Sequence, residues 1–233
     1  MQDNNIHILC TRPLPQPLLD AALDAGIQID VSPFIETESI LTVEVQQEIE
    51  QASLQAVPVV FTSMNAVDAV TVFLDGHQPG WEIYAIGTAT ARLVKAYFGE
   101  AAIAGTANDA AALADVIAGK DHIDEVVFFC GDQRREELPA ILREHEIEVT
   151  EIVVYQTIAL PHKVEKSYHG ILFFSPSAVQ SFFQKNKPLP ETILFAIGNT
   201  TANEITKYAT NKVIISNEPG KENLVHTMIE YFS

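Results

Sequence analysis

The sequence predicts an α/β protein with two doubly wound, mostly parallel sheets. Three observations support this fold class. Short apolar runs alternate with segments of helical spacing, several motifs recur after about 111 residues, and the composition is that of a globular chain. With 233 residues, 47% of them hydrophobic, the chain is long enough for two small cores at roughly 100–150 residues per domain.

Runs rich in Val, Ile and Phe predict the strands. They are IHILC (6–10), VPVVF (57–61), EIYAI (82–86), EVVFF (125–129), EIVVY (151–155), GILFF (170–174) and TILFAI (192–197). Such continuous apolar runs are typical of parallel strands, which need a crossover helix between them. Apolar residues at i, i+3 and i+4 predict those helices at Ala66 to Leu74, Ala89 to Phe98, Asp109 to Ile117, Glu136 to Glu144, Ala178 to Phe183 and Thr201 to Tyr208.

The two halves of the chain resemble each other. FTSMNAV (61–67) recurs as FFSPSAV (173–179), 112 residues later, and AIGTATA (85–91) recurs as AIGNTTA (196–202), 111 residues later. The region around Cys10 resembles the region around Cys130 more weakly. A period this long indicates a duplicated domain, because solenoid repeats recur within about 50 residues.

Charge and motifs exclude several function classes. The 31 acidic side chains outnumber the 14 basic ones, and the net charge of −17 repels nucleic acid. The seven histidines lack the spacing of zinc ligands, and no P-loop, dinucleotide-binding or serine-hydrolase motif occurs. No run approaches the roughly 18 apolar residues of a membrane-spanning helix. We therefore expect no metal, no nucleic-acid partner and no membrane insertion.

Two further features favour the cytoplasm. The polar and acidic residues Met1 to Asn5 do not resemble the basic start of a secretory signal. Cys10 and Cys130 each end an apolar run, which is typical of buried reduced thiols.

Hydroxyl side chains gather where predicted strands end and helices begin. Ser and Thr there cap a helix, and the remaining N–H groups of the first turn favour a bound anion. Capping alone is the simpler interpretation for any single residue, but the loops at the carboxyl edge of a doubly wound sheet surround one ligand position. An acidic chain can therefore still hold a carboxylate or phosphate. These residues are Thr62, Ser63, Thr88, Ser175, Ser177, Thr200 and Thr201.

Few basic residues lie near these loops. Arg12 follows the first strand, where it could bind a carboxylate of a ligand bidentately or form a salt bridge to Asp30 or a neighbouring acidic residue. Arg134 and Arg135 adjoin two glutamates, which favours an ordinary charged first turn for at least one of them.

Tyr155 ends the strand EIVVY, and alternation places its phenol on the opposite face from Val154. Two interpretations stay open. The phenol points into a ligand site, where it could donate a hydrogen bond or act as a weak general acid, or it is an interfacial aromatic with a solvated hydroxyl.

Taken in order, these motifs resemble those of the uroporphyrinogen-III synthases. The motifs are TRP (11–13), FTSMNAV, AIGTATA, VVFFCGDQRREELP (126–139), VVYQT (153–157), FFSPSAV and AIGNTTA. They span nearly the whole chain, and their joint order is far more specific than any one of them. Met64, after the serine of FTSMNAV, departs from the family's common forms.

The resemblance implies a cyclising lyase of tetrapyrrole biosynthesis. Such an enzyme closes the linear tetrapyrrole hydroxymethylbilane to uroporphyrinogen III, with inversion of ring D and loss of water, and uses no cofactor. It implies a cytoplasmic monomer with a small-molecule substrate, handed over transiently from hydroxymethylbilane synthase. The carboxylates on every pyrrole of that substrate agree with the anion-binding loops inferred from the residues.

The resemblance also implies a domain division and a site. It gives residues 1–34 with 159–233 as one domain, 38–154 as the other, and 35–37 with 155–158 as a two-segment crossing linker. Tyr155 is then the candidate catalytic contact. The candidate substrate-binding residues are Thr11, Arg12, Thr62, Ser63, Thr88, Thr90, Ser175, Ser177, Thr200 and Thr201.

Two other function classes remain open. The first is a non-catalytic two-lobed module that binds a small anion. The second is a phosphate-binding sugar isomerase, which would need a base near the Ser- and Thr-rich helix starts; no Glu or His is obviously placed for that role.

Overall fold

A computed structural model describes residues 6–218 and 220–233, so the expectation about Met1 to Asn5 lies outside the described residues. The chain forms two compact units. Unit 1 comprises the described parts of Met1–Glu36 and Ile158–Ser233, and unit 2 comprises Thr37–Thr157. The chain passes from one unit to the other inside two strands, β3 (Ile35–Ser39) and β8 (Glu148–Ala159), so the segments expected as linkers, 35–37 and 155–158, are extended and hydrogen-bonded.

Unit 1 contains a five-stranded sheet in the order β11-β10-β9-β1-β2, paired in parallel throughout. Its strands are β1 (Ile6–Cys10), β2 (Ile27–Val31), β9 (Gly170–Phe173), β10 (Ile193–Ala196) and β11 (Val213–Ile215). One face packs on α1 (Gln16–Asp24) and α9 (Lys221–Phe232), and the other packs on α7 (Pro176–Phe183) and α8 (Asn199–Ile205). The central strands are therefore buried on both faces, which explains their continuous apolar sequences.

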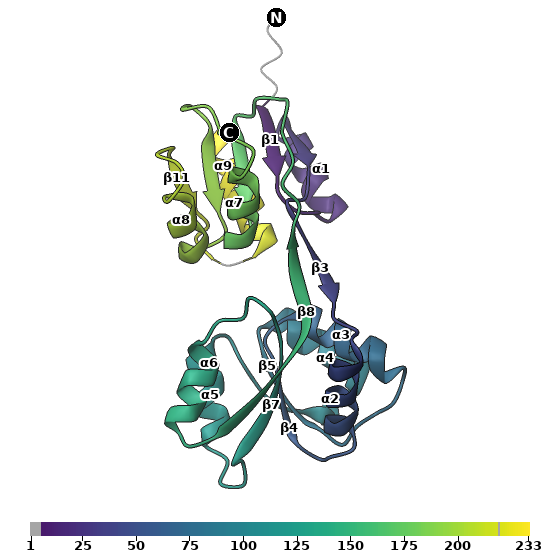
Figure 1. Ribbon diagram of the computed structural model, residues 1–233. Coiled ribbons are helices and arrows are strands. Elements are labelled where there is room, and N and C mark those ends of the chain that lie inside the picture. Colours follow the sequence, from purple (N-terminus) through teal and green to yellow (C-terminus); the bar gives the residue numbers. More distant parts are fainter. Residues whose placement is uncertain (1–5, 219) are drawn as a thin grey trace, which may run out of the picture. The chain divides into compact units, whose positions relative to one another are not determined.

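Unit 2 contains a six-stranded sheet in the order β3-β8-β7-β4-β5-β6, and the pairings from β8 to β6 are parallel. The remaining strands are β4 (Pro58–Phe61), β5 (Glu82–Ile86), β6 (Ile103–Ala107) and β7 (Glu125–Gly131). Helices α2 (Val43–Ser53), α3 (Met64–Leu74) and α4 (Thr88–Phe98) cover one face, and a short 3-10 turn (Glu100–Ala102) follows α4. Helices α5 (Ala110–Ala118) and α6 (Glu137–Glu144) cover the other face (Figure 1).

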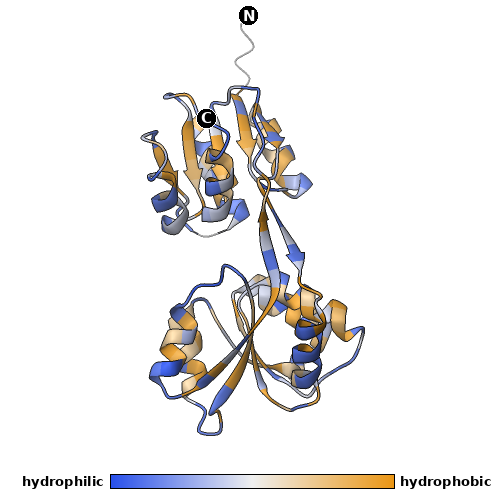
Figure 2. Cartoon of the chain, viewed as in Figure 1, coloured by the Kyte–Doolittle hydropathy of each residue, from blue (hydrophilic) through white to orange (hydrophobic). Residues whose placement is uncertain are grey.

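The hydropathy of the chain follows this layered arrangement. Figure 2 shows hydrophobic residues along the strands of both sheets. The aromatic side chains Phe61, Trp81 and Phe129 pack together on the face of unit 2 that carries α2, α3 and α4. Burial of such side chains supplies the main driving force for each unit.

The strand orders support the expected duplication. In unit 1, β9 lies between β1 and β10, and in unit 2, β4 lies between β7 and β5. The sequence repeat pairs β9 with β4 and β1 with β7, so the order β11-β10-β9-β1-β2 matches β6-β5-β4-β7-β8 strand for strand. The pair β3 and α2 has no counterpart among the described residues that follow β8.

Candidate functional site

Each sheet has one position where the chain connections diverge. In unit 2 the chain leaves β4 through α3 to β5, and it leaves the neighbouring strand β7 through α6 to β8 on the opposite side. Loops that part in this way leave a crevice at the carboxyl ends of the two strands, where doubly wound proteins bind ligands. In unit 1 the corresponding position lies between β1 and β9.

A cavity of about 410 Å³ lies at this position in unit 2. Its walls combine the loops that follow β4, β6 and β7 with residues of the strands β5, β7 and β8 and of the first turn of α6. The lining residues are Thr62, Ser63, Ile86, Asn108, Asp109, Ala110, Phe128, Gln133, Arg134, Arg135, Glu137, Leu138 and Tyr155. Three of the predicted residues, Thr62, Ser63 and Tyr155, are thereby brought together.

Tyr155 is positioned by an irregularity of β8. The pairing of β7 with β8 shifts register between Cys130 and Gly131, so that Gly131 is opposite Tyr155. The Tyr155 carbonyl accepts a hydrogen bond from the Asp132 N–H at 3.1 Å, which fixes the backbone. The half-buried ring packs against the core, while the hydroxyl has no hydrogen-bond partner among the described residues. It is therefore free to contact a ligand in the cavity.

Two helix starts at this cavity are capped by side chains. The Ser63 hydroxyl accepts a hydrogen bond from the Ala66 N–H at 3.2 Å at the start of α3. Asp109 accepts one from the Ala112 N–H at 2.9 Å at the start of α5. A cap satisfies one of the helix's unpaired N–H groups, and the positive end of the helix dipole still favours an anion nearby.

The loop after β7 carries the two adjacent arginines. Arg134 forms ion pairs with Glu151 and, at 2.6 Å, with Glu136. Its hydrogen bond to Glu151 raises the pKa of the Arg134 guanidinium. Arg135 is exposed and forms no ion pair with any residue that the structure describes.

The corresponding position in unit 1 is formed by Thr11 and Arg12. The Thr11 hydroxyl is fully buried and donates a hydrogen bond to the Leu172 carbonyl at 2.8 Å, which ties the end of β1 to β9. The Arg12 guanidinium lies 5.6 Å from the centre of the Phe174 ring, and burial lowers its pKa. The Phe174 ring stabilises the cation without neutralising it.

The alternative partner expected for Arg12 is engaged elsewhere. Asp30 accepts hydrogen bonds from Lys166 and Tyr168, each at 3.0 Å. Desolvation raises the pKa of Asp30, but these hydrogen bonds outweigh it and the net shift is downward. Arg12 therefore has no carboxylate partner within the described part of the chain.

The other predicted residues lie at the starts of α4, α7 and α8. Ser175 caps α7 by accepting a hydrogen bond from the Ala178 N–H at 3.2 Å, and Ser177 is half-buried in the first turn. Thr88 and Thr200 are exposed, in first turns that no side chain caps.

Three of the predicted threonines have buried side chains. Thr11, Thr90 and Thr201 are 0%, 5% and 3% exposed. Any contact of these residues with a ligand would therefore use the backbone or act through the loops that the side chains support.

Comparison with known proteins assigns the family. A match to the family described as Uroporphyrinogen-III synthase HemD covers residues 17–226. The chain belongs to the uroporphyrinogen-III synthase family. Uroporphyrinogen-III synthetase from Helicobacter pylori has 18% identity and a TM-score of 0.68 over 97% of this chain and 99% of that one. A mutant uroporphyrinogen III synthase from Thermus thermophilus has 15% identity and a TM-score of 0.66 over 97% of both chains. At these identities the two structures confirm the fold.

Sequence reasoning missed several cavity residues of this uroporphyrinogen-III synthase family member. Asn108 and Asp109 follow β6, a strand that the sequence analysis did not predict. An Asn-Asp pair before the alanine-rich helix at 110–118 is an N-cap signal that could have placed them. Arg135 could not be separated from Arg134 by sequence, because the two are adjacent and share acidic neighbours.

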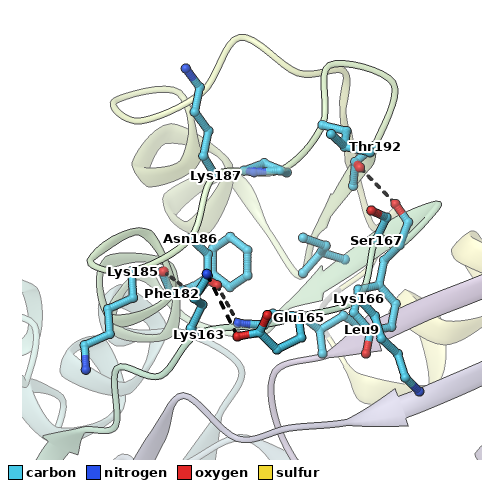
Figure 3. Close-up of a pocket in the computed structure, with 15 residues that line it drawn as sticks. Leu9, Lys163, Glu165, Lys166, Ser167, Phe182, Lys185, Asn186, Lys187 and Thr192 are labelled. Carbon is cyan, nitrogen blue, oxygen red and sulfur yellow. Dashed lines mark hydrogen bonds and ion pairs between the residues drawn. The ribbon is translucent and has the colours of Figure 1, made fainter.

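A second cavity, of about 210 Å³, lies in unit 1 near the amino ends of β9 and β10. Four lysines line it, Lys163, Lys166, Lys185 and Lys187. Figure 3 shows Lys166, Lys185 and Lys187 extending in three different directions, and Lys166 is paired with Asp30. Their ammonium groups do not converge on one ligand atom, and the cavity lies at the sheet edge opposite the carboxyl ends. We therefore take the loops at the carboxyl ends of the parallel strands as the candidate site.

Neither a metal centre nor a membrane span is found in the described part of the chain. Residues 6–218 and 220–233 contain no group of three His, Cys, Asp or Glu side chains that could hold a metal ion. None of their helices is both long and apolar enough to cross a membrane.

Proposed function

We propose that this chain catalyses the closure of hydroxymethylbilane to uroporphyrinogen III, with inversion of ring D and loss of water. Family membership over residues 17–226 is the observation that carries the proposal. The reaction proceeds by loss of the hydroxyl from the ring A hydroxymethyl group, which gives an azafulvene. The substituted carbon of ring D attacks it to form a spiro pyrrolenine, and fragmentation, recombination and closure follow.

Tyr155 is the proposed catalytic residue. Tyr155 lines the cavity of unit 2 and its hydroxyl has no hydrogen-bond partner among the described residues, so the phenol can donate a hydrogen bond to the departing hydroxyl of the substrate. The hydroxyl then leaves as water. Because an electron-rich pyrrole expels this group readily, the phenol assists a step that also occurs unaided, and most of the catalysis comes from holding the chain of pyrroles in a productive conformation.

The loops at the carboxyl edges bind the carboxylates of the substrate in this proposal. Arg12 is a half-buried cation without a carboxylate partner in the described chain, and the first turns of α4 and α8 have no side-chain cap. Backbone N–H groups and one guanidinium suit carboxylates without making the chain basic. The proposed contacts are Thr11, Arg12, Thr62, Ser63, Thr88, Thr90, Ser175, Ser177, Thr200 and Thr201.

We place the reaction in the cytoplasm, in a monomer that receives the bilane from hydroxymethylbilane synthase without a stable complex. Cys10 and Cys130 are buried, unpaired thiols, which suits a reducing compartment. No cofactor enters the proposed mechanism, since every step is a proton transfer or a carbon–carbon bond rearrangement of the substrate itself.

A coupled assay tests the proposal. Porphobilinogen and hydroxymethylbilane synthase generate the bilane with and without this protein, and the oxidised porphyrins are separated by isomer. The proposal predicts the type III isomer only when the protein is present. Type I product in both samples, from protein shown to be folded by circular dichroism, would leave only the family and fold assignments.

A further inference from the structure

We propose that Arg135 binds a carboxylate of the substrate in the cavity of unit 2, whereas its neighbour Arg134 holds the loop after β7 in place. This inference rests on the proposed function, because it gives one cavity residue a role toward the polycarboxylate substrate. It separates two adjacent arginines that the sequence presents as equivalent.

Arg134 belongs to a closed network of four charges. Arg134 and Arg143 each pair with both Glu136 and Glu151, and Arg143 contacts these carboxylates at 2.7 and 2.6 Å. Two cations and two anions leave the network neutral. The network joins the loop after β7 to α6 and β8, so the charge and donors of Arg134 are already engaged in structure.

Arg135 has the same charge and a different environment. It lines the cavity, is exposed, and forms no ion pair with a described residue. The two acidic residues that line the cavity lie at helix starts, Asp109 as the cap of α5 and Glu137 in the first turn of α6. Arg135 is therefore the uncompensated cation of this cavity as the structure describes it.

The charge of unit 2 favours such a cation as the partner of an anionic ligand. Between residues 37 and 157 the chain has 20 acidic and 6 basic side chains. This field repels a carboxylate from most of the unit, so binding needs a local donor that offsets it. A guanidinium can grip a carboxylate bidentately, with two parallel N–H···O hydrogen bonds.

The test compares matched variants of the two arginines. Arg135→Gln is expected to raise KM about tenfold with kcat changed less than about twofold, the effect of losing one hydrogen bond to a charged group. Arg135→Lys keeps the positive charge but not the two parallel N–H donors of a guanidinium, so it should recover part of this loss. Arg134→Gln should lower the melting temperature and raise KM by clearly less than Arg135→Gln does, because it loosens the loop but removes no proposed contact with the substrate. Arg92→Gln, on the exposed side of α4, controls for removing one positive charge.

A binding measurement separates this inference from the proposed function. Uroporphyrin, with eight carboxylates, is titrated into wild type and each variant, and its affinity is measured without turnover. We expect Arg135→Gln to bind it about tenfold more weakly than Arg134→Gln. If wild type fails to make the type III isomer yet Arg135→Gln still binds the probe more weakly, the proposed reaction fails and the carboxylate site stands. Equal affinities and equal KM values for the two variants would overturn the assignment of Arg135.

Discussion

The ring of Tyr155 lies against the backbone of Gly131, the residue opposite it on β7. A Cβ atom built on Gly131 would lie 2.7 Å from the Tyr155 hydroxyl oxygen, and closer still to the ring carbons. Only glycine therefore allows the ring to occupy this position. The last residue of β7 thus sets the position of the proposed catalytic phenol on β8.

We predict that Gly131→Ala displaces the Tyr155 ring and lowers turnover several-fold, by about as much as removal of the Tyr155 hydroxyl, because the displaced phenol no longer meets the departing hydroxyl of the substrate. It should also cost about 1–3 kcal/mol of stability, as overpacking does. Gly80→Ala is the control, since a Cβ there meets only Ala56 at 3.8 Å. In a Tyr155→Ala background the stability cost of Gly131→Ala should disappear; a cost of the same size there would show that the ring is not what the new methyl group meets.

Tyr155→Phe should lower turnover several-fold while the fold and melting temperature are retained. The variant removes the hydroxyl of a residue that lines the cavity and keeps the ring against Gly131. Steady-state kinetics on the bilane check this, with Tyr97→Phe, an exposed tyrosine of α4, as the control. Unchanged turnover would remove Tyr155 from the mechanism.

The capping serines permit a test that separates stability from binding. Ser63→Ala and Ser175→Ala each remove a helix cap and should lower the free energy of unfolding by about 1 kcal/mol. Aspartate also caps a helix, so Ser63→Asp should keep the stability while its negative charge raises KM for a polycarboxylate substrate. Urea unfolding and KM are measured on the same samples, and an unaltered KM in Ser63→Asp would mean that no substrate carboxylate approaches this helix start.

Alkaline pH should destabilise the protein through its two thiols. Burial raises the pKa of Cys10 from 9.0 to about 12 and that of Cys130 from 9.0 to about 11. In the unfolded chain both ionise near 9, so above that pH the folded state holds more protons and the free energy of unfolding falls as pH rises. Below about pH 9 both thiols are protonated in the folded and the unfolded chain, and the free energy of unfolding keeps its full contribution from them.

Cys10→Ala should therefore flatten the alkaline part of the stability curve, measured by urea unfolding at several pH values. A thiol reagent at pH 8 should leave both cysteines of the folded protein unmodified and modify two per chain after denaturation. Rapid modification of the folded protein would contradict this account of their burial.

Much of the architecture was predictable because buried parallel strands carry a strong local signal. The apolar runs at β4, β5, β7, β9 and β10 are all strands, and the repeat anticipated the matching strand orders. The signal failed where elements are short or half-exposed. Strand β3 reads IETES, with four exposed residues, and α2 buries only Ile49, Ala52 and Ser53.

The candidate site was less accessible to sequence reasoning. The position of Ser63 after an apolar run predicted its place at a helix start, and the structure shows the cap. Sequence could not show that Thr90 and Thr201 turn inward, because one residue along a helix decides between burial and exposure. The sequence also could not show that Asp30 pairs with Lys166, which lies 136 residues away. Because of that pairing, Asp30 is not the partner of Arg12.

The isomer composition of the first product tests the central claim most directly. Preformed hydroxymethylbilane is mixed with the protein, with a heat-denatured sample or with buffer alone, and the products are oxidised to porphyrins once the bilane in the buffer sample has closed by itself. We predict type III porphyrin with the native protein and type I in the other two samples. Type I alone in all three, with a native protein of confirmed fold, would contradict the claim that this chain closes the bilane with inversion of ring D.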